Sequence, residues 1–210
     1  MSKLLYIQSS PRENRSYSTK VANAFIEKYQ QNNSNDKIVT LNIFEESLPE
    51  FSGFTIDAKY AIMHGQEHTQ EQKQAWQKVE IIIEQFKSSD KYLFSIPMWN
   101  FSIPYKLKQY FDILVQPGYT FKYTQEKGYE GLVLNKPVTV IYSRGGKYEP
   151  GSGAEAFDLQ KKYTELILAF MGFTNINSIL VEPTLQGGPD TSKEILEQAI
   201  ENARKLADSF

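Results

Sequence analysis

The chain has no cysteine among its 210 residues. This absence excludes disulfides, thiolate metal ligands and thiol nucleophiles, so any redox chemistry must come from a bound cofactor. No apolar run approaches the roughly 20 residues that a membrane-spanning helix needs, and we expect no membrane partner. The net charge of -2 gives no electrostatic basis for binding nucleic acid, because that function needs clustered lysines and arginines.

Several catalytic signatures are also missing. No G-x-S-x-G elbow or Walker A loop is present, which disfavours a serine hydrolase and a P-loop NTPase. His64 and His68 have the spacing of two ligands on one helix face, but Gly65 weakens that helix and no third ligand is evident, so we expect no metal site. The segment 151–156 fits a relaxed dinucleotide pattern, yet it does not directly follow a strand, and we interpret it as a helix start.

The order of apolar and polar segments predicts alternating strands and helices. With 40% apolar residues the chain can bury a core. We expect one α/β domain over residues 1–210, with a flavodoxin-like, doubly wound, five-stranded parallel sheet in the order 2-1-3-4-5 and helices on both faces. The expected strands cover residues 4–7, 37–42, 92–96, 137–142 and 176–181. The expected helices cover 21–29, 71–86, 105–114, 154–171 and 191–209, with a short helix and a loop within 54–68.

The start of the chain bears on its location. The first expected strand begins at Leu4, which leaves no room for the charged and apolar regions of a signal peptide. We therefore expect a cytoplasmic protein.

The loop over residues 97–104 lies between a buried strand and an amphipathic helix. In open α/β sheets ligands bind at the carboxyl ends of the strands, which is where this loop is expected. Its two large aromatic residues, Trp99 and Phe101, and the amide of Asn100 suit a flat heteroaromatic ring that needs stacking and hydrogen bonds at its edge. A plain strand-to-helix turn whose aromatics cap the core is the alternative interpretation.

Two further loops have the same position relative to a strand. Ser10, Ser16 and Ser18 lie between the first strand and the first helix, where hydroxyls and first-turn amides suit a phosphate. Helix capping is the alternative for these serines. Ser143-Arg144-Gly145-Gly146 follows the fourth strand, and its glycines let backbone approach a ligand, although an ordinary glycine turn fits as well. A doubly wound sheet brings all three loops to one crevice.

These motifs occur in the order found in a known family. The sequence resembles the FMN-dependent NADH:azoreductases, also NADH:quinone oxidoreductases, which have a flavodoxin-like fold. The resemblance extends from residue 3 to about residue 172, and Trp99 stands where the family commonly has Tyr. The motifs that carry it are Ser10, 16–18, 97–101, 107–112, 118–124, 131–132 and 143–146.

The resemblance implies an enzyme with bound FMN and NADH as electron donor, reducing quinones and aromatic azo compounds by ping-pong two-electron transfer. It also implies a homodimer with each active site at the interface. In the family the serines hold the FMN phosphate, the Met-aromatic-Asn-Phe loop holds the isoalloxazine, and the Ser-Arg-Gly-Gly loop borders its polar edge. The implied cofactor-binding residues are Ser10, Ser16, Tyr17, Ser18, Pro97, Met98, Trp99, Asn100, Phe101, Ser143, Arg144, Gly145 and Gly146.

Individual roles follow from residue chemistry. We expect Asn100 to be the catalytic residue, donating a hydrogen bond at the N5 and O4 edge of the flavin. The segment 116–135 is too long for an idle connection and is expected to form a lid or pocket wall. Phe121, Tyr123 and Phe170 are candidates for the acceptor pocket, with core packing as the alternative for each.

Two other classes of protein use a similar sheet. A flavodoxin-like electron carrier binds FMN without an organic substrate, but such carriers tend to be shorter and strongly acidic. A receiver-type signalling domain needs an acidic cluster after the first strand, where this chain has Gln8-Ser9-Ser10. The oxidoreductase is therefore the favoured interpretation.

Overall fold

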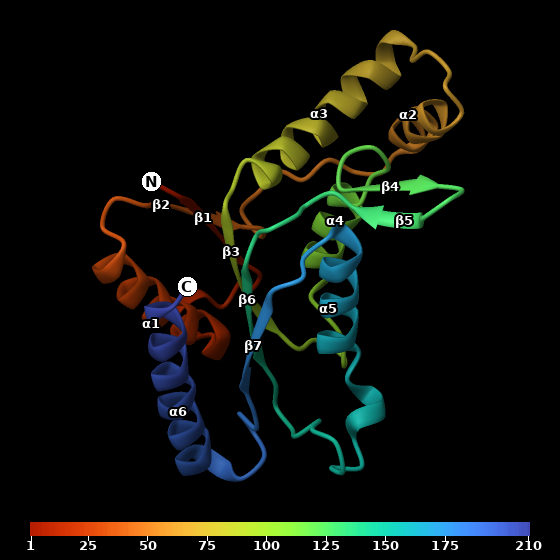
Figure 1. The fold of residues 1–210 in the computed structure, drawn as a ribbon. Helices are drawn as coiled ribbons and strands as arrows, with labels where there is room; N and C mark the ends of the chain where they lie inside the picture. Colours follow the sequence, from red (N-terminus) through yellow and green to blue (C-terminus); the bar gives the residue numbers. More distant parts are fainter.

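The computed structural model describes residues 1–210 and is built around a sheet of five parallel strands (Figure 1). The strands lie in the order β2-β1-β3-β6-β7, which is the order 2-1-3-4-5 when the strands of this sheet are counted along the chain. The predicted fold class is therefore confirmed. The strands of the sheet are β1 (Lys3–Gln8), β2 (Lys37–Asn42), β3 (Lys91–Pro97), β6 (Val138–Ser143) and β7 (Ile176–Val181).

The central strands are continuous apolar runs because helices cover them on both faces. All six residues of β6 are buried, and β3 buries every residue from Tyr92 to Ile96. In the register of the sheet, Phe94 lies between Ile7 of β1 and Val140 of β6. The edge strand β2 buries only Leu41 fully, since one side of it lacks a neighbouring strand.

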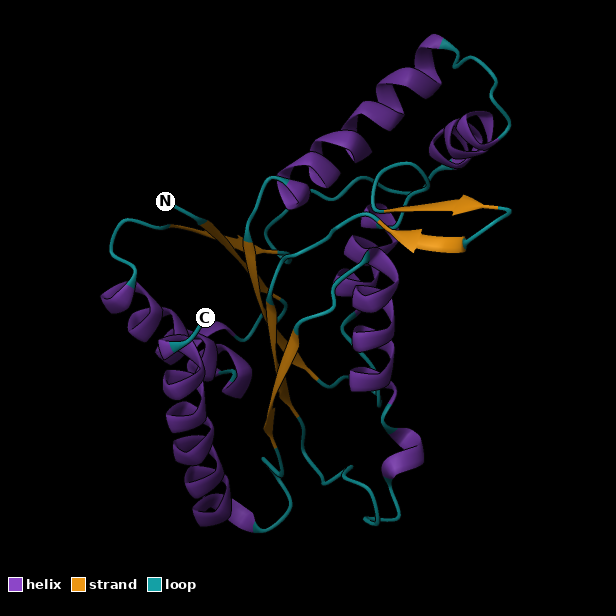
Figure 2. Ribbon diagram, viewed as in Figure 1, coloured by secondary structure: helices purple, strands orange, loops and turns teal.

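Helices form a layer on each face of the sheet (Figure 2). One layer consists of α1 and α6, and the other consists of α3, α4 and α5, while α2 packs on α3 beyond the sheet. The helices are α1 (Tyr17–Asn32), α2 (Gly53–Met63), α3 (Gln70–Lys87), α4 (Tyr105–Leu114), α5 (Leu159–Met171) and α6 (Gly188–Asp208), with single 3-10 turns η1 (Glu13–Arg15) and η2 (Glu155–Phe157).

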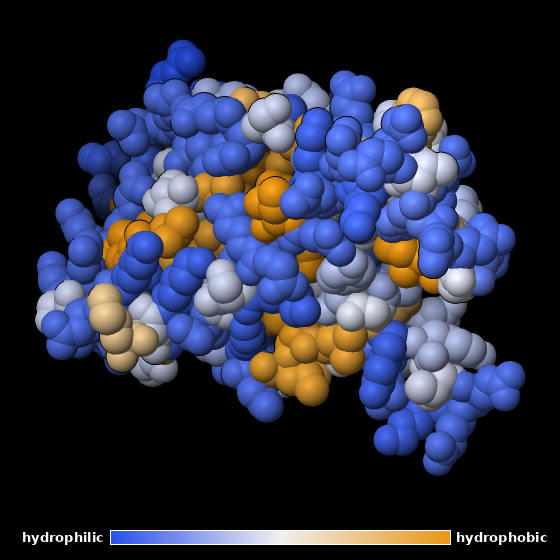
Figure 3. All heavy atoms as spheres, turned by 90° about the horizontal axis from the view of Figure 1, so that it is seen from above, coloured by the Kyte–Doolittle hydropathy of each residue, from blue (hydrophilic) through white to orange (hydrophobic).

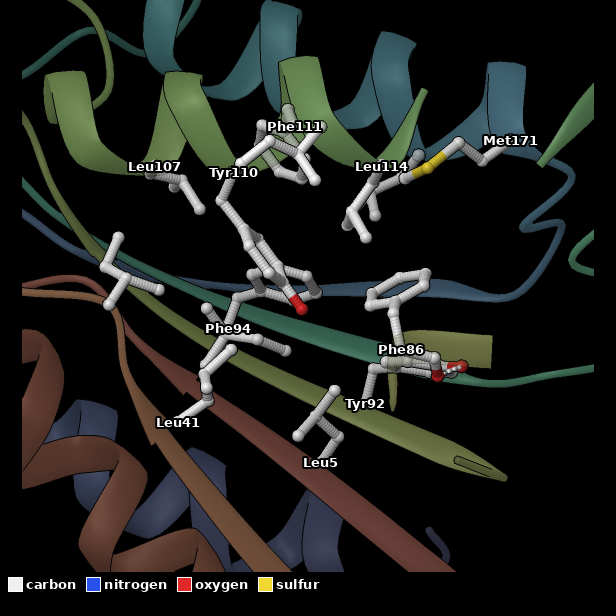
Figure 4. Close-up of a cluster of buried hydrophobic side chains, with 14 of the residues drawn as sticks. Leu5, Leu41, Phe86, Tyr92, Phe94, Leu107, Tyr110, Phe111, Leu114 and Met171 are labelled. Atoms are coloured by element: carbon white, nitrogen blue, oxygen red, sulfur yellow. Dashed lines mark hydrogen bonds between the residues drawn. The ribbon is translucent and has the colours of Figure 1, made fainter. Parts of the chain in front are cut away.

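The larger core lies between the sheet and the layer of α3, α4 and α5 (Figure 4). In it, Leu5 and Phe94 from the strands face Leu107, Tyr110 and Leu114 from α4. These α4 residues recur at helical spacing, so one face of the helix is apolar and is buried. The smaller core packs one side of β1, β3, β6 and β7 against α1 and α6.

The predicted helix over 154–171 is wrong in its first turn. Residues 155–157 form the 3-10 turn η2, and α5 begins only at Leu159. The break is at Asp158, whose side chain caps α5 by accepting a hydrogen bond from the Lys161 amide at 2.9 Å. At the other end of the chain, α6 begins at Gly188 and is longer than predicted.

The segment 116–135 contains a hairpin that the sequence did not reveal. Its strands are β4 (Phe121–Thr124) and β5 (Gly128–Gly131), which pair in antiparallel fashion. The hairpin packs on the end of α5, where the Val133 amide donates to the Met171 carbonyl at 2.9 Å. A side chain at Gly131 would overlap the backbone of Gly172, so only glycine permits this close approach.

No helix of the structure has both the length and the apolar character needed to cross a membrane. Figure 3 shows one face of the surface, on which apolar side chains form several separate patches between hydrophilic residues.

Candidate active site

The loops after β1, β3 and β6 begin side by side at the carboxyl edge of the sheet, because these three strands are parallel neighbours. The Ser9 amide donates to the Ser95 carbonyl at 3.1 Å, which joins the first loop to β3. The Met98 amide donates to the Ser143 carbonyl at 2.8 Å, which joins the second loop to β6. The three predicted loops therefore share one edge of the sheet.

The predicted serines gather at the start of α1. Ser16 and Ser18 are buried, and their hydroxyl oxygens lie 3.1 Å apart. Ser16 is the N-cap residue by its extended backbone, but its side chain makes no capping hydrogen bond. The first-turn amides of a helix have no partner within the helix, so they are available here together with the hydroxyls. This arrangement favours anion binding over simple capping.

Two further residues of the predicted phosphate site lie nearby. Ser10 is buried in the loop before η1, and its hydroxyl oxygen accepts from the Arg12 amide at 3.4 Å. Tyr17, the first residue of α1, is half-buried and has the Lys20 ammonium 5.8 Å from its ring centre. Lys20 is exposed, so it adds positive charge near this helix start without occupying it.

The loop after β3 is a tight turn with unusual backbone. Trp99 and Ser102 exchange two backbone hydrogen bonds of 2.9 and 3.0 Å. The two residues between them, Asn100 and Phe101, have φ angles of 47° and 68°. Asn tolerates this left-handed region, whereas for Phe it costs of order 1–3 kcal/mol and persists only where the surroundings enforce it. The turn is therefore held in one conformation by its neighbours.

Trp99 and Phe101 point to different sides of this turn. The ring of Trp99 lies 5.7 Å from Phe44 and 6.2 Å from Tyr105, centre to centre. A hollow of about 440 Å³ opens on this side of the exposed Asn100. Its walls are Trp99, Asn100, Ser102, Ile103, Tyr105, Lys108 and Tyr163.

On the other side, the ring of Phe101 lies 5.2 Å from Phe157 and 6.4 Å from Tyr148. Phe101 is 47% exposed and Phe157 is 53% exposed, so this aromatic surface is open to a ligand. The loop after β3 thus presents the Asn100 amide between two separate aromatic walls.

The loop after β6 contributes backbone rather than charge. Arg144 is buried, and its guanidinium lies 2.9 Å from Asp158 and 3.2 Å from Glu182, so its charge faces the interior. A side chain at Gly145 would come within 3.0 Å of the Leu185 side chain. Gly146 is half-buried, and a side chain there would have its nearest neighbour at 3.7 Å, farther than at Gly145. Ser143 is buried, and its carbonyl accepts from Met98.

The three predicted acceptor residues cluster elsewhere. Phe170 lies 4.8 Å from Phe121 and 5.5 Å from Tyr129, and Tyr129 lies 5.1 Å from Tyr123. This aromatic cluster, Phe121, Tyr123, Tyr129 and Phe170, sits at the end of α5, whereas the Asn100 turn contacts its start through Leu159. Eleven residues of α5 span roughly 16 Å, so within one chain the cluster and the turn are apart.

The two histidines have other contacts. His68 uses Nε2 in a hydrogen bond with the Ala58 carbonyl at 2.9 Å. The ring of His64 stacks on Tyr60, with centres 6.2 Å apart. These contacts give both side chains structural roles around α2.

Sequence reasoning missed the partners of the two aromatic walls. Phe44 follows β2 closely, and its position after a strand end is the one signal that pointed to the site. Tyr105 begins α4, where the sequence predicts a helix but gives no sign that this side chain is 64% exposed beside the loop. Tyr148 and Phe157 had no signal, because their distance from β6 along the chain hid their contact with Phe101.

The residues present fit a flavin mononucleotide. Buried serine hydroxyls and free helix amides suit its phosphate. The exposed amide of Asn100 and the aromatic walls suit a flat ring with polar edges.

Comparison with known proteins gives the family of the chain. The chain matches the model of a family described as having a flavodoxin-like fold over residues 2–207, which defines its class. It is 49% identical over 210 residues to an FMN-dependent NADH:quinone oxidoreductase of Nitratidesulfovibrio vulgaris (strain DP4), covering 100% of both chains. It is 39% identical to FMN-dependent NADH:quinone oxidoreductase 3 of Pseudomonas fluorescens, covering 99% of this chain and 96% of that protein. The chain therefore belongs to the family of FMN-dependent NADH:quinone oxidoreductases.

Solved structures of azoreductases share the fold of this chain. The azoreductase of Bacillus anthracis str. Sterne superposes with a TM-score of 0.92 at 33% identity, covering 100% of both chains. An FMN-dependent NADH-azoreductase of Bacillus anthracis str. Ames Ancestor, solved in complex with FMN, has a TM-score of 0.89 at 29% identity, covering 100% of this chain and 99% of that one.

Proposed function

We propose that this protein is an FMN-dependent NADH:quinone oxidoreductase that also reduces aromatic azo compounds. The observation that carries the proposal is the meeting of the buried Ser16 and Ser18 hydroxyls and the rigid Asn100 turn at one sheet edge, in a chain of this family. When bound, FMN would supply the redox chemistry between NADH and the acceptor, because no side chain of this chain carries electrons.

The chain's own residues bind and orient the cofactor. Ser16, Ser18 and Ser10 hold the phosphate with the first amides of α1, where the helix dipole favours a dianion. Trp99 and Phe101 form the aromatic walls beside the ring, each fixed by its own neighbours. The backbone of Ser143, Gly145 and Gly146 borders the ring's polar edge, together with Pro97 and Met98 at the end of β3.

Asn100 is the proposed catalytic residue. Its amide is exposed at the tip of the turn and is able to donate a hydrogen bond to the ring edge where negative charge builds on reduction. The turn that the two Trp99–Ser102 hydrogen bonds close fixes the backbone from which this amide extends. No ionisable group is required in this role, because water can deliver the protons that the acceptor takes up.

An assay without any reductase partner tests the function. Purified protein with FMN should oxidise NADH with menadione or methyl red as acceptor. Double-reciprocal plots at several acceptor concentrations should be parallel, because the two substrates occupy the same position in turn. A chain that binds FMN but does not bleach it with NADH under anaerobic conditions would be an electron carrier instead.

The resemblance implies a homodimer, and we propose that a second copy completes each site. The aromatic cluster supports this, since Tyr123 and Tyr129 are 60% and 66% exposed although they form a contiguous apolar group. A second copy would bring its cluster to the acceptor side of the Asn100 turn. Sedimentation velocity should give a dimer, and Tyr129→Glu should shift it towards the monomer; a monomeric wild type with full activity contradicts the proposal.

One domain over residues 1–210 and a cytoplasmic location stay predictions.

A further inference from the structure

Three consecutive residues at the start of α5, Asp158, Leu159 and Gln160, contact the loops of the site. The Leu159 amide donates to the Phe101 carbonyl at 3.1 Å. The Gln160 side-chain amide donates to the Ile96 carbonyl at 2.9 Å, and Gln160 is fully buried. Ile96 and Phe101 flank the segment 97–100, so the start of α5 holds this segment at both ends.

Arg144 holds the same three-residue segment from the other side. Its Nε donates to Gln160 Oε1 at 3.0 Å, and its terminal nitrogen lies 2.9 Å from Asp158 Oδ2. Its other terminal nitrogen contacts Glu182 Oε2 at 3.2 Å, which in turn accepts from the Tyr148 amide at 3.3 Å. The planar, forked guanidinium is suited to bind these groups at once, which the single ammonium of a lysine is not.

This set of contacts is closed to solvent. The side chains of Arg144, Asp158 and Glu182 are 1%, 9% and 7% exposed. A buried charge is tolerated only when it is paired, so the guanidinium fixes its partners in place rather than reaching a ligand. The contacts run from Arg144 in the loop after β6 through the start of α5 to both ends of the loop after β3.

The Asn100 turn needs such support. Phe101 at a φ of 68° has an unfavourable backbone conformation, and the surroundings must enforce it. Inside the turn, the two Trp99–Ser102 hydrogen bonds hold the backbone. The Phe101 carbonyl accepts its hydrogen bond from outside the turn, from the Leu159 amide of α5.

We propose that Arg144 and Gln160 are positioning residues that act through Leu159 and Ile96 to set the conformation of the Asn100 turn. They do so without touching the flavin. The inference rests on the proposed function for its catalytic consequence, although the effect on the turn itself does not require a cofactor.

The test uses Gln160→Leu and Arg144→Lys, with Lys161→Ala as the matched control. Gln160→Leu removes both hydrogen bonds of the side chain and adds no charge. Lys161 lies on the next position of α5 and pairs with Glu165 at 2.8 Å, with both side chains about one-third exposed. Lys161→Ala should therefore change nothing at the turn. If Arg144→Lys does not fold, Gln160→Leu decides the matter.

The first readout is hydrogen exchange of the apoprotein. In Gln160→Leu the amides of Trp99, Ser102 and Leu159 should exchange at least tenfold faster than in the wild type, and amides of α1 should not change. The second readout is the loaded enzyme: reduction by NADH should slow roughly tenfold, and FMN affinity should change by less than about threefold, because the phosphate site lies on α1. The visible circular dichroism of the bound flavin should change in the same variant.

Wild-type exchange at Trp99 and Ser102 in a folded Gln160→Leu protein would overturn the inference. So would equal losses in FMN affinity and in reduction rate, which would show a general loss of structure. A wild-type chain that binds no FMN would contradict the proposed function and would leave the exchange result interpretable.

Discussion

The hydroxyl oxygens of Ser16 and Ser18 lie 3.1 Å apart in a buried position at the start of α1, and the Ser16 side chain does not cap the helix. Two hydroxyls on alternate positions with free helix amides beside them form a set of donors for one anion. Because both serines lie at the start of α1, substitutions there test phosphate binding without changing the loop proposed to hold the flavin ring.

Replacing Ser16 and Ser18 together by Ala should weaken FMN binding. Each lost hydrogen bond to a charged phosphate costs about 1.5–3 kcal/mol, which is roughly ten- to hundredfold in the dissociation constant. Titration of the apoprotein with FMN measures the change. Ser34→Ala is the control, since Ser34 is exposed beyond the other end of α1. An unchanged dissociation constant in the double variant would assign these serines to the fold alone.

Asn100 has two separable roles, since its amide faces solvent and its φ of 47° shapes the turn. Gly keeps this backbone conformation without strain, whereas Ala keeps neither the amide nor the conformation. Asn100→Gly should slow flavin reduction by NADH roughly ten- to hundredfold, the effect of losing about 1.4–2.7 kcal/mol of stabilisation in the transition state.

Stopped-flow reduction and FMN titration on both Asn100 variants distinguish the roles. Affinity should fall less than the rate, because the phosphate contacts lie on another loop. If Asn100→Gly reduces at the wild-type rate while Asn100→Ala does not, the side chain serves the turn only.

The hairpin should depend on the glycine contact at the end of α5. Gly131→Ala should destabilise the protein by about 1–3 kcal/mol, because the new methyl group overlaps the backbone of Gly172, which has a φ of 112° and cannot easily move. Gly53→Ala is the matched control: it has open space and stands in the first turn of α2, so it should stabilise by about 0.4–1 kcal/mol. Urea unfolding of both variants measures the difference, and equal stabilities would refute the contact.

The sheet was predictable because burial on both faces requires continuous apolar runs, as in β3 and β6. The hairpin was not predictable, since its four-residue strands carry exposed polar and aromatic residues and depend on Gly131 meeting Gly172. Contacts between residues distant in the chain leave no periodic pattern in the sequence.

The site was predictable to the level of loops, and less so for side chains. Placing Ser16, Asn100 and Gly145 at one edge follows from strand order alone. Strand order does not predict that the Arg144 side chain points into the interior. Its partners there, Asp158 and Glu182, come from the start of a helix and from a later loop. Asp158 is of a residue type that favours the N-cap position. The helix-forming residues before it led to a predicted helix that starts earlier than α5 does.

Buried tyrosines predict loss of stability at alkaline pH. Burial raises the pKa of Tyr6 to about 12, and burial also raises the pKa of Tyr110. In the unfolded chain a tyrosine has a pKa near 10, so above pH 10 the unfolded state releases protons first and the free energy of unfolding falls. This stability is fully present below pH 10 and is lost as pH rises towards the folded pKa, at about 1.4 kcal/mol per pH unit for each group.

Tyr110→Phe should relieve part of this sensitivity. The Tyr110 hydroxyl is buried in the larger core without a hydrogen-bond partner, so its removal should leave stability at pH 8 unchanged or raise it by about 1 kcal/mol (Figure 4). Tyr6→Phe is the contrast, because the Tyr6 hydroxyl bonds Ser95 Oγ at 2.9 Å, and its loss should cost about 0.5–1.5 kcal/mol at pH 8. Urea unfolding at pH 8 and pH 10.5 compares the two. Both variants should lose less stability than the wild type between these pH values, and a Tyr110→Phe protein that is markedly less stable at pH 8 would show that the hydroxyl has a partner after all.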